Sequence, residues 1–311
     1  MNGLSSSSQP SFGKQGVIWG AALWLTHLSM LTPLMSLTLW ISGVPAVMLY
    51  LKTPRLVFAG IAAASLAVGA AIAGPLAIGY LWIALSMLAP AIVIAESYRR
   101  KLTVRKTLTN GVLAYLAVFL LSLLLATALG GNVNEAIASM IREGMAYLPP
   151  TMQDALTDET IQAYIQLTVT MIPFYFIASA VLLTALTHTL SRRIARRLGE
   201  TLPSLPPIRD WKLPKALVWY YLIALFIDLI TPTNDGSFFS TIIVNLVSLF
   251  MLAFAVQGLS FLFFVGYVKR KAWIPWVGIV AVIFIMPLFS AFSLLGVFDT
   301  AFPLRDRLRK S

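Results

Sequence analysis

Apolar stretches of about 20 residues recur along almost the whole chain, and each is long enough to cross a membrane as a helix. A hydrocarbon core is roughly 30 Å thick, and a helix rises about 1.5 Å per residue. Strands that cross a membrane would instead alternate apolar and polar residues over about ten positions. Only 11% of the residues are charged, against roughly 25% in soluble domains. We therefore predict an all-α protein, a polytopic transmembrane helical bundle of about eight to ten membrane segments.

Prolines and glycines divide the apolar stretches into separate helices, because proline removes a backbone donor and clashes with the preceding turn. Pro33 divides the first long stretch, Gly74 and Pro75 form a tight turn, and Pro173 kinks a later helix. The helices that we expect cover residues 15–32, 34–51, 56–74, 75–95, 108–129, 160–190, 215–231, 238–267 and 272–298.

The predicted organisation is a single membrane domain between two short tails. Residues 1–14 form a cytoplasmic tail, residues 15–302 the membrane domain, and residues 303–311 a basic C-terminal tail. Within the membrane domain we expect an outer loop over 130–157 and a cytoplasmic loop over 191–214.

Cations lie on alternate loops, and this pattern sets the expected orientation. Most of the 23 Lys and Arg residues fall in loops at 52–55, 99–106, 192–215 and 269–271, whereas the opposite side carries Arg142 and several acidic residues. Because cytoplasmic loops carry an excess of Lys and Arg, we predict a multi-pass protein of the cell membrane with a cytoplasmic N-terminus. We interpret the net charge of +11 as a topology signal that also faces anionic lipid, and we expect no nucleic-acid partner.

The basic tail conflicts with a count of nine crossings, since nine crossings from a cytoplasmic N-terminus would put residues 303–311 outside. Two alternatives remain open. Either the charge rule is broken at the C-terminus, or Pro287 divides 272–302 into two short segments that return the tail to the cytoplasm. We favour the second alternative.

The outer loop contains a predicted helix of its own. Apolar residues of NEAIASMIREGMAYL (134–148) recur on one helical face, which is typical of a helix that lies on a membrane surface. Thr157 has the features of an N-cap, and Asp158 and Glu159 follow it in the first turn. The loop is either a lid over an outward-facing cavity or an interfacial connector.

Small residues recur at four-residue spacing on two predicted helices. Ser65, Gly69 and Ala73 share one helix, and Gly16 and Gly20 lie on the first. Small side chains at this spacing let helix backbones approach closely inside a membrane. The two faces therefore serve either internal packing or the binding of another membrane protein.

Three polar side chains inside predicted membrane helices are the candidates for a substrate site. Asp228, in FIDLITP, is the one carboxylate that we place inside a helix, about one turn from its outer end. Asn245 and Gln257 share the long helix 238–267, and their spacing turns them about 120° apart. Lipid would leave both amides unpaired. Gln257 beside Gly258 therefore indicates a close helix contact or a polar cavity, and interhelical bonding and ligand contact remain the alternatives.

Catalytic and metal chemistry find no support in the sequence. The absence of cysteine excludes disulfides, thiolate metal sites and a cysteine nucleophile. His27 and His188 lie on different helices without acidic neighbours, so we expect packing or hydrogen-bonding roles and no metal site. We find no nucleophile elbow, no phosphate-binding loop and no paired intramembrane aspartates. An enzyme that acts on lipid phosphates would need a cluster of Arg and His near one interface, and we place the arginines in the loop clusters instead. From the absence of catalytic constellations we predict no enzyme activity and no cofactor.

A spaced set of residues marks the C-terminal third: Asn245, Gln257 with Gly258, the KRK cluster at 269–271, and Gly296, Asp299 and Arg305 in the ending LLGVFDTAFPLRDRL. This set resembles the YybS-like family of bacterial multi-spanning membrane proteins. The resemblance implies a bacterial cytoplasmic-membrane protein and carries no established reaction or substrate. The N-terminal part is similar in style to substrate-capture subunits of energy-coupling vitamin transporters, although the long eighth helix and extra C-terminal spans depart from those subunits.

Two hypotheses for function follow. The first is a transporter-like or substrate-capture protein for a small molecule, with an outward-facing cavity lined partly by Asp228 and Asn245 and covered by 130–157. The second is a structural or regulatory protein that binds another membrane protein through its small-residue faces. A polar cavity that contains Asp228, Asn245 or Gln257 would favour the first hypothesis, and small-residue faces turned toward lipid would favour the second.

Overall fold

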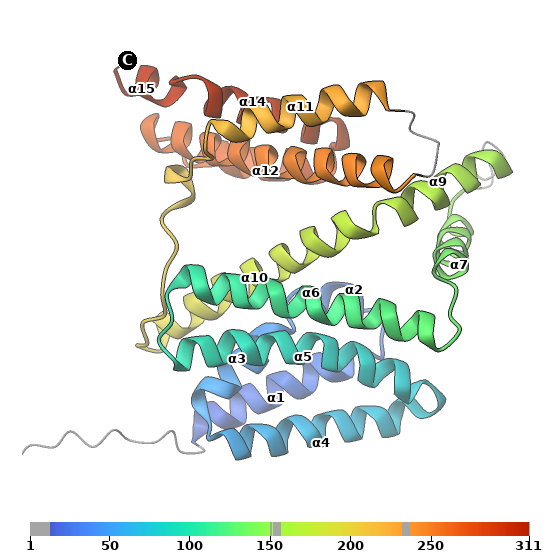
Figure 1. The fold of residues 1–311 in the computed structure, drawn as a ribbon. Coiled ribbons are helices and arrows are strands. Elements are labelled where there is room, and N and C mark those ends of the chain that lie inside the picture. The colour runs from blue at the N-terminus through green and yellow to red at the C-terminus, as the bar shows by residue number, and fades with distance from the viewer. Residues whose placement is uncertain (1–12, 150, 152–156, 232–236, 311) are drawn as a thin grey trace, which may run out of the picture. The chain divides into compact units, whose positions relative to one another are not determined.

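The computed structural model describes residues 13–149, 151, 157–231 and 237–310, and this part of the chain forms helices and no strand (Figure 1). The prediction of an all-α helical membrane bundle is confirmed. Among the described residues, four helical segments are long and apolar enough to cross a membrane: Arg55–Arg99, Val104–Ala128, Ile172–Arg197 and Phe238–Val268. Shorter apolar helices cover Gly43–Lys52, Ala216–Ile230 and Leu288–Ala301.

The chain divides into two compact units, and each is described by itself. Unit 1 comprises Met1–Val133 and Phe176–Ser204, and unit 2 comprises Asn134–Tyr175 and Leu205–Ser311. The bounds of a single membrane domain over 15–302 stay a prediction, because this division concerns compact parts within it.

Unit 1 is built from the N-terminal helices and most of one later helix. Its elements are α1 (Lys14–Ser29), α2 (Met35–Thr38), α3 (Gly43–Lys52), α4 (Arg55–Ala73), η1 (Gly74–Leu76), α5 (Ala77–Arg99), α6 (Val104–Ala128) and α10 (Ile172–Arg197) from Phe176 onward. The prediction of one helix over 34–51 is wrong, since the chain turns between α2 and α3. Pro45 explains the break, because it lies in the first turn of α3, where its missing N–H is tolerated, whereas inside a longer helix its ring would clash with the preceding turn.

The predicted Gly-Pro turn between α4 and α5 is confirmed. Gly74 ends α4 with a φ of 56°, which residues with a side chain rarely adopt. Pro75 follows within the short 3-10 helix η1. The turn brings α4 and α5 back against each other within unit 1.

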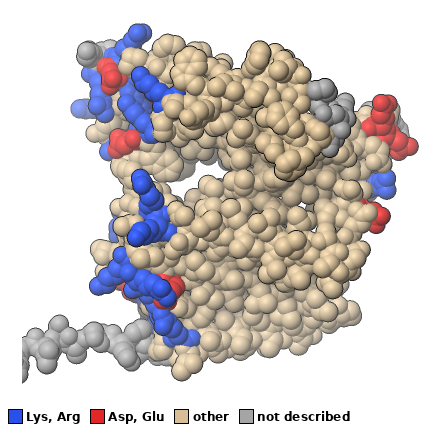
Figure 2. All heavy atoms as spheres, in the orientation of Figure 1, with Lys and Arg blue, Asp and Glu red and all other residues tan. Residues whose placement is uncertain are grey.

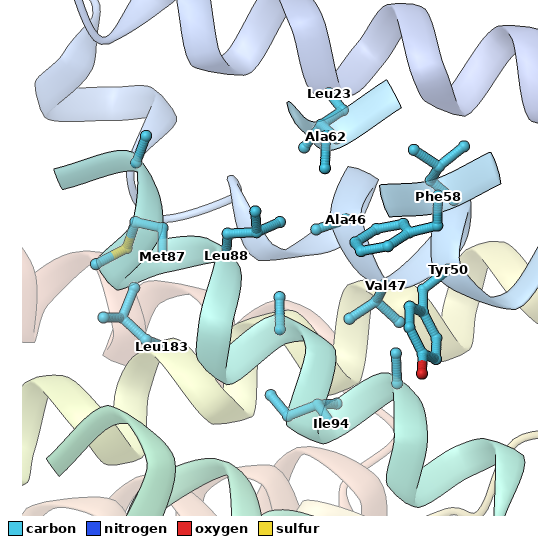
Figure 3. Packing of buried hydrophobic residues seen from close by; sticks show 14 of the residues in the cluster. Leu23, Ala46, Val47, Tyr50, Phe58, Ala62, Met87, Leu88, Ile94 and Leu183 are labelled. Atoms are coloured by element: carbon cyan, nitrogen blue, oxygen red, sulfur yellow. The ribbon is translucent and has the colours of Figure 1, made fainter. Parts of the chain in front are cut away.

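The core of unit 1 surrounds α3, in which every residue from Gly43 to Tyr50 is buried. In Figure 3, Ala46, Val47 and Tyr50 of α3 share one cluster with Phe58 of α4 and Ile94 of α5. Ten helical residues extend only about 15 Å, half of a hydrocarbon core. Helix α3 is therefore too short to span and is enclosed by the longer helices.

The small-residue faces pack inside unit 1. A Cβ added at Gly69 would lie 1.9 Å from the Tyr80 hydroxyl oxygen, and one at Gly20 would lie 3.6 Å from Ile61. The Ser65 hydroxyl lies 2.8 Å from Nδ1 of His27. Gly16 is also buried, and Ala73 packs half-buried against the core. These contacts correspond to internal packing, the first of the two alternatives.

One end of the unit 1 helices is basic and cross-linked by polar contacts. The Glu96 carboxylate accepts from Arg55 at 2.7 Å, from Arg100 at 2.9 Å and from the Tyr50 hydroxyl at 2.8 Å. Arg99 donates to the carbonyl of Thr53 at 2.6 Å. Figure 2 shows Lys and Arg side chains gathered at one end of the helices of this unit.

Unit 2 is built around the longest helix. Its elements are α7 (Val133–Met145), α9 (Asp158–Thr170), the start of α10, η2 (Ile208–Asp210), α11 (Ala216–Ile230), α12 (Phe238–Val268), α13 (Trp273–Phe284), α14 (Met286–Ala301) and α15 (Leu304–Lys310). Helix α7 confirms a helix within the predicted outer loop. Thr157 caps α9 as predicted, because its hydroxyl accepts from the Thr160 N–H at 3.2 Å.

Helices α12 and α14 cross in direct backbone contact and run in parallel. A Cβ added at Gly258 would lie 2.2 Å from the carbonyl oxygen of Phe292, and one at Gly296 would lie 1.8 Å from that of Phe254. Only glycine permits this approach. Gln257, further along α12 than Phe254, contacts Asp299, further along α14 than Gly296, so residue numbers rise together along both helices.

The C-terminal tail returns to the KRK end of unit 2. The predicted segment 272–298 is divided, because α13 ends at Phe284 and α14 begins at Met286. Beyond α14, Leu308 of α15 faces the same small cavity as Val265 and Lys269 at the end of α12. This geometry agrees with the alternative in which two short segments bring the tail back. Figure 2 shows basic side chains gathered at one end of this unit as well.

Candidate functional site

The three predicted substrate-binding residues do not meet in one site. Asp228 lies half-exposed on α11, and within the described part of the chain its carboxylate makes no hydrogen bond or ion pair. Asn245 and Gln257 are buried on α12 and contact different segments. Among the described residues, these three side chains share no hydrogen-bond partner.

Asn245 bonds the two backbone groups that a helix break leaves without each other. The N–H of Phe174 donates to Oδ1 of Asn245 at 2.7 Å, and Nδ2 of Asn245 donates to the carbonyl of Thr170 at 2.8 Å. Residues 170 and 174 would bond to each other in an unbroken helix, but Pro173 separates α9 from α10 at this point. The amide therefore inserts between the two backbone groups and satisfies both.

Gln257 joins α12 to the chain segment that precedes α11. Its Oε1 accepts from the N–H of Leu213 at 3.1 Å, and its Nε2 donates to the carbonyl of Trp211 at 3.3 Å and to Asp299 at 2.6 Å. The sequence assigned Trp211 and Leu213 to a cytoplasmic loop, and the structure packs this loop directly against α12. The buried amide is fully used by protein partners.

Asp299 and Arg305 form a buried ion pair beside Gln257. The Arg305 side chain is 4% exposed and that of Asp299 is 0% exposed, and Nη2 of Arg305 lies 2.6 Å from the carboxylate. Arg305 also donates to the hydroxyl of Ser260 at 3.0 Å and to the carbonyl of Arg209. Ser260 in turn donates toward the carbonyl of Ile208 at 2.7 Å. We name Gln257, Ser260, Asp299 and Arg305 the α12 polar network.

This network corrects two expectations. Asp228 is not the one carboxylate inside a helix, because Asp299 lies within α14 and Glu96 within α5. Arg305, which we assigned to the basic tail, is buried, and an ion pair with Asp299 neutralises its charge. An aspartate in an apolar helix, followed six positions later by an arginine beyond a proline, was the available signal. Both residues belong to the spaced set that carries the family resemblance, which gives them no role.

Unit 1 buries polar atoms that the protein does not pair. Among the described residues, buried atoms without a hydrogen-bond partner include the hydroxyls of Thr107, Tyr115, Thr184 and Ser191 and the Nε2 of His188. Buried polar groups are paired in the great majority of cases, and an unpaired one costs about 1–3 kcal/mol. We name these five residues the α6–α10 polar cluster.

The polar cluster lies where α6 and α10 touch. Thr184, His188 and Ser191 share one face of α10, and Thr107 and Tyr115 share one face of α6. Gly111 of α6 makes the contact close, since a Cβ added there would lie 2.6 Å from Cγ2 of Thr184. The first residue of α3 completes the enclosure. A Cβ added at Gly43 would lie 2.7 Å from the Thr187 hydroxyl and 3.4 Å from that of Tyr115.

His188 presents one ring nitrogen to this cluster. Its Nδ1 lies 2.7 Å from the hydroxyl of Tyr98. Nε2 is then a donor or an acceptor according to which tautomer that contact selects. We predicted a packing or hydrogen-bonding role for His188, and its contact with Tyr98 is a hydrogen bond.

Other hydroxyls of unit 1 behave differently. Thr26, Thr53 and Thr127 donate to carbonyl groups of the preceding turn, at 3.1, 2.8 and 3.1 Å. Such local bonds are the usual way in which threonine is satisfied inside a helix. The hydroxyls of Thr107 and Thr184 make no such bond among the described residues. The polar spacing along α6 and α10 was visible in the sequence, but their missing partners were not.

The described residues contain no group of three or more His, Cys, Asp or Glu side chains that could hold a metal ion.

Comparisons with known proteins place the chain in a family. Its sequence matches the family described as "Predicted membrane protein (DUF2232)" over residues 21–300. It is also 31% identical over 144 residues to the "Uncharacterized protein YybS" of Bacillus subtilis (strain 168), and the match covers 45% of each chain. The aligned part thus spans less than half the length of this relative. No solved structure matches. Because the family match covers most of the sequence, the chain belongs to the DUF2232 family of membrane proteins, as its resemblance to the YybS-like family predicted.

Proposed function

We propose that this protein is a transporter-like membrane protein that holds a small polar molecule inside unit 1, at the α6–α10 polar cluster. The observation that carries the proposal is that α6 and α10, which meet at Gly111 and Thr184, carry five buried polar atoms without a partner among the described residues. Polar and ionisable groups within membrane helices point to substrate pathways by default, because they are costly to bury. The positive-inside pattern supports a cytoplasmic N-terminus for the same protein.

The chemistry of the cluster favours an uncharged molecule rich in hydrogen-bonding groups. Each hydroxyl both donates and accepts, and Nε2 of His188 adds one more donor or acceptor. The cluster itself contains no carboxylate, lysine or arginine. A molecule that pairs with several of these groups would remove the cost of burying them, which gives binding its driving force.

Access to the cluster requires a helix movement within unit 1. Thr107 and Ser191 are 0% exposed, and Thr184 is 1% exposed. A molecule therefore reaches them only when α10 separates from α3 and α6. The glycines at these contacts, Gly43 and Gly111, place no side chain that would interlock the helices. An enclosed site that opens by helix movement is what a transport cycle requires.

Cysteine accessibility tests this opening, because the chain has no cysteine and each single variant carries one thiol. We expect Ser191→Cys, in membrane vesicles, to react slowly with a small maleimide. The matched control is Ala195→Cys, equally buried on α10 and one turn nearer its end. We expect it to stay unreactive. If Ser191→Cys reacts only after denaturation, or if Ala195→Cys reacts as fast, the cluster does not open and the proposal fails.

A second test fills the cluster with one methyl group. Gly43→Ala would place a methyl 2.7 Å from the Thr187 hydroxyl, whereas Gly60→Ala on α4 meets nothing within 4 Å. A metabolite panel in a thermal-shift assay should yield a compound that stabilises the wild type and Gly60→Ala but not Gly43→Ala. A compound that stabilises all three proteins equally binds elsewhere.

The alternative of a partner-binding membrane protein gains no support from the faces that suggested it. Gly20, Ser65 and Gly69 pack against Ile61, His27 and Tyr80 inside unit 1. We therefore carry the capture hypothesis forward, with its site moved from Asp228, Asn245 and Gln257 to the α6–α10 polar cluster.

A further inference from the structure

We infer that unit 2 carries a binding site for a phosphate group beside the end of α12. This inference is independent of the proposed function, which rests on unit 1. A cavity of about 220 Å³ lies there, and four cations line it: Arg209, Lys212, Arg305 and Arg309. Because water occupies about 30 Å³ per molecule in the liquid, the cavity has room for a phosphate group together with water.

The buried wall of this cavity is the Arg305 guanidinium, held in one orientation by the α12 polar network. Asp299 engages its Nε and Nη2, Ser260 accepts from Nη2, and the carbonyl of Arg209 accepts from Nη1. A guanidinium has five N–H groups, so one N–H of Nη1 remains beyond these contacts. An arginine fixed in this way loses little further side-chain freedom when it binds an anion.

Two other arginines are positioned by aromatic rings of α12. The guanidinium of Arg209 lies 4.0 Å from the ring centre of Tyr267, and that of Arg309 lies 5.5 Å from that of Phe264. Stacking on a ring orients a guanidinium and leaves its N–H edge available for an anion. Positioned arginines that lie on one cavity suit the several oxygens of a phosphate group.

Asp299 neutralises Arg305, so the positive charge available to a ligand comes from Arg209, Lys212 and Arg309. Asp210 and Asp306 line the cavity and are exposed to solvent. Arg209 approaches Asp210 only to 4.0 Å, and both side chains are well exposed, at 39% and 49%. Exposed pairs of this kind contribute little. Arg209 therefore remains available for a ligand. So do Lys212 and Arg309, which form no ion pair among the described residues.

The position of the cavity is compatible with two sources of the phosphate. It lies at the basic end of unit 2, where α12 is followed by Lys269, Arg270 and Lys271. A neighbouring cavity of about 660 Å³ is lined by Tyr267, on which Arg209 stacks, and by Trp276. Basic pockets beside aromatic residues at a membrane surface bind anionic lipid headgroups. A soluble phosphate would use the same cations.

The test compares two cavity cations with a matched cation outside the cavity. Lys212→Gln and Arg309→Gln each remove a charge that lines the cavity, whereas Arg307→Gln removes an exposed charge of α15 that does not line it. All three leave Asp299 and Arg305 intact, so the fold is retained, and thermal unfolding of each variant checks this directly. The full chain is purified and exposed to inorganic phosphate, or to vesicles of phosphatidylcholine with or without phosphatidylglycerol.

We expect the wild type to bind one of these probes, and the two cavity variants to bind at least about tenfold more weakly, as loss of one charge-assisted contact predicts. Arg307→Gln should bind as the wild type does. Binding of phosphatidylglycerol vesicles alone identifies a lipid headgroup, and stabilisation by inorganic phosphate identifies a soluble ligand. If neither probe binds, or if Arg307→Gln weakens binding as much as the cavity variants do, the inference is overturned.

Discussion

Unit 1 and unit 2 both bury polar side chains between helices. Among the described residues, the α12 polar network of unit 2 is paired within the protein and the α6–α10 polar cluster of unit 1 is not, although the hydroxyl of Ser293 in unit 2 is also unpaired. In the α12 polar network, Gln257, Asp299 and Arg305 all find partners, several of them in the segment before α11. In the α6–α10 polar cluster, hydroxyls at similar burial stay unpaired among the described residues. A saturated network contributes to the fold, whereas an unsaturated cluster lowers stability and offers groups to a ligand. The comparison separates buried polar groups that stabilise the fold from buried polar groups that we propose serve binding.

The strongest test of the comparison is Asp299→Ala. It leaves the Arg305 guanidinium buried without its counter-charge, and breaking a buried pair in this way costs about 3–5 kcal/mol. Unfolding by heat or denaturant in detergent measures the loss. Asp306→Ala, which removes an exposed carboxylate nearby, should change stability by less than about 0.5 kcal/mol. Equal effects of the two substitutions would mean that the network does not stabilise unit 2.

Gln257→Leu should have the next largest effect. It leaves the N–H of Leu213 without its partner and removes the amide donor to Asp299, and leaving a buried polar group unpaired costs about 1–3 kcal/mol of stability. The same unfolding assay applies. Gln166→Leu, at an exposed position on α9, is the control and should be close to neutral. A neutral Gln257→Leu would show that the amide is not structural and would return it to the list of ligand contacts.

Thr184→Val should change stability in the opposite direction and by the smallest amount. Valine has nearly the shape of threonine and removes a hydroxyl that has no partner, so stability without ligand should stay unchanged or rise by up to about 1 kcal/mol. Thr127→Val on α6 removes a hydroxyl that bonds to the backbone and serves as the control. A loss of more than about 1 kcal/mol for Thr184→Val would place this hydroxyl with the structural groups of unit 2 and erase the contrast.

Much of the fold follows from sequence periodicity and from prolines. The apolar stretches predicted the helical membrane bundle, Gly74 marked its turn, and Thr157 its cap. The helix over 34–51 was mispredicted because Pro45, a residue tolerated in a first turn, starts α3. Helix ends were predicted well where the residue at the end has a strong preference for that position, as Gly74 and Thr157 do. Pro45 is tolerated in a first turn and so gave no such signal.

The site was less predictable, because pairing depends on residues far apart in the sequence. Gln257 and Asn245 were recognised as buried amides that must find partners, but those partners are backbone groups of Leu213 and Phe174. No pattern in the sequence states which loop packs against which helix. The α6–α10 polar cluster was overlooked because threonine and serine in membrane helices usually satisfy themselves, and their failure to do so is a property of the packing.

The late position of Arg305 in the chain also bears on how the protein is made. Synthesis proceeds at about 5–20 residues per second, and Arg305 emerges about 50 residues after Gln257. The amide of Gln257 is therefore synthesised several seconds before Arg305, whereas the carboxylate of Asp299 precedes it by about one second or less. The contacts of Arg305 with Asp299 and Ser260 therefore form only after translation has reached α15. A chain that ends before residue 305 would bury the carboxylate of Asp299 without the cation that neutralises it.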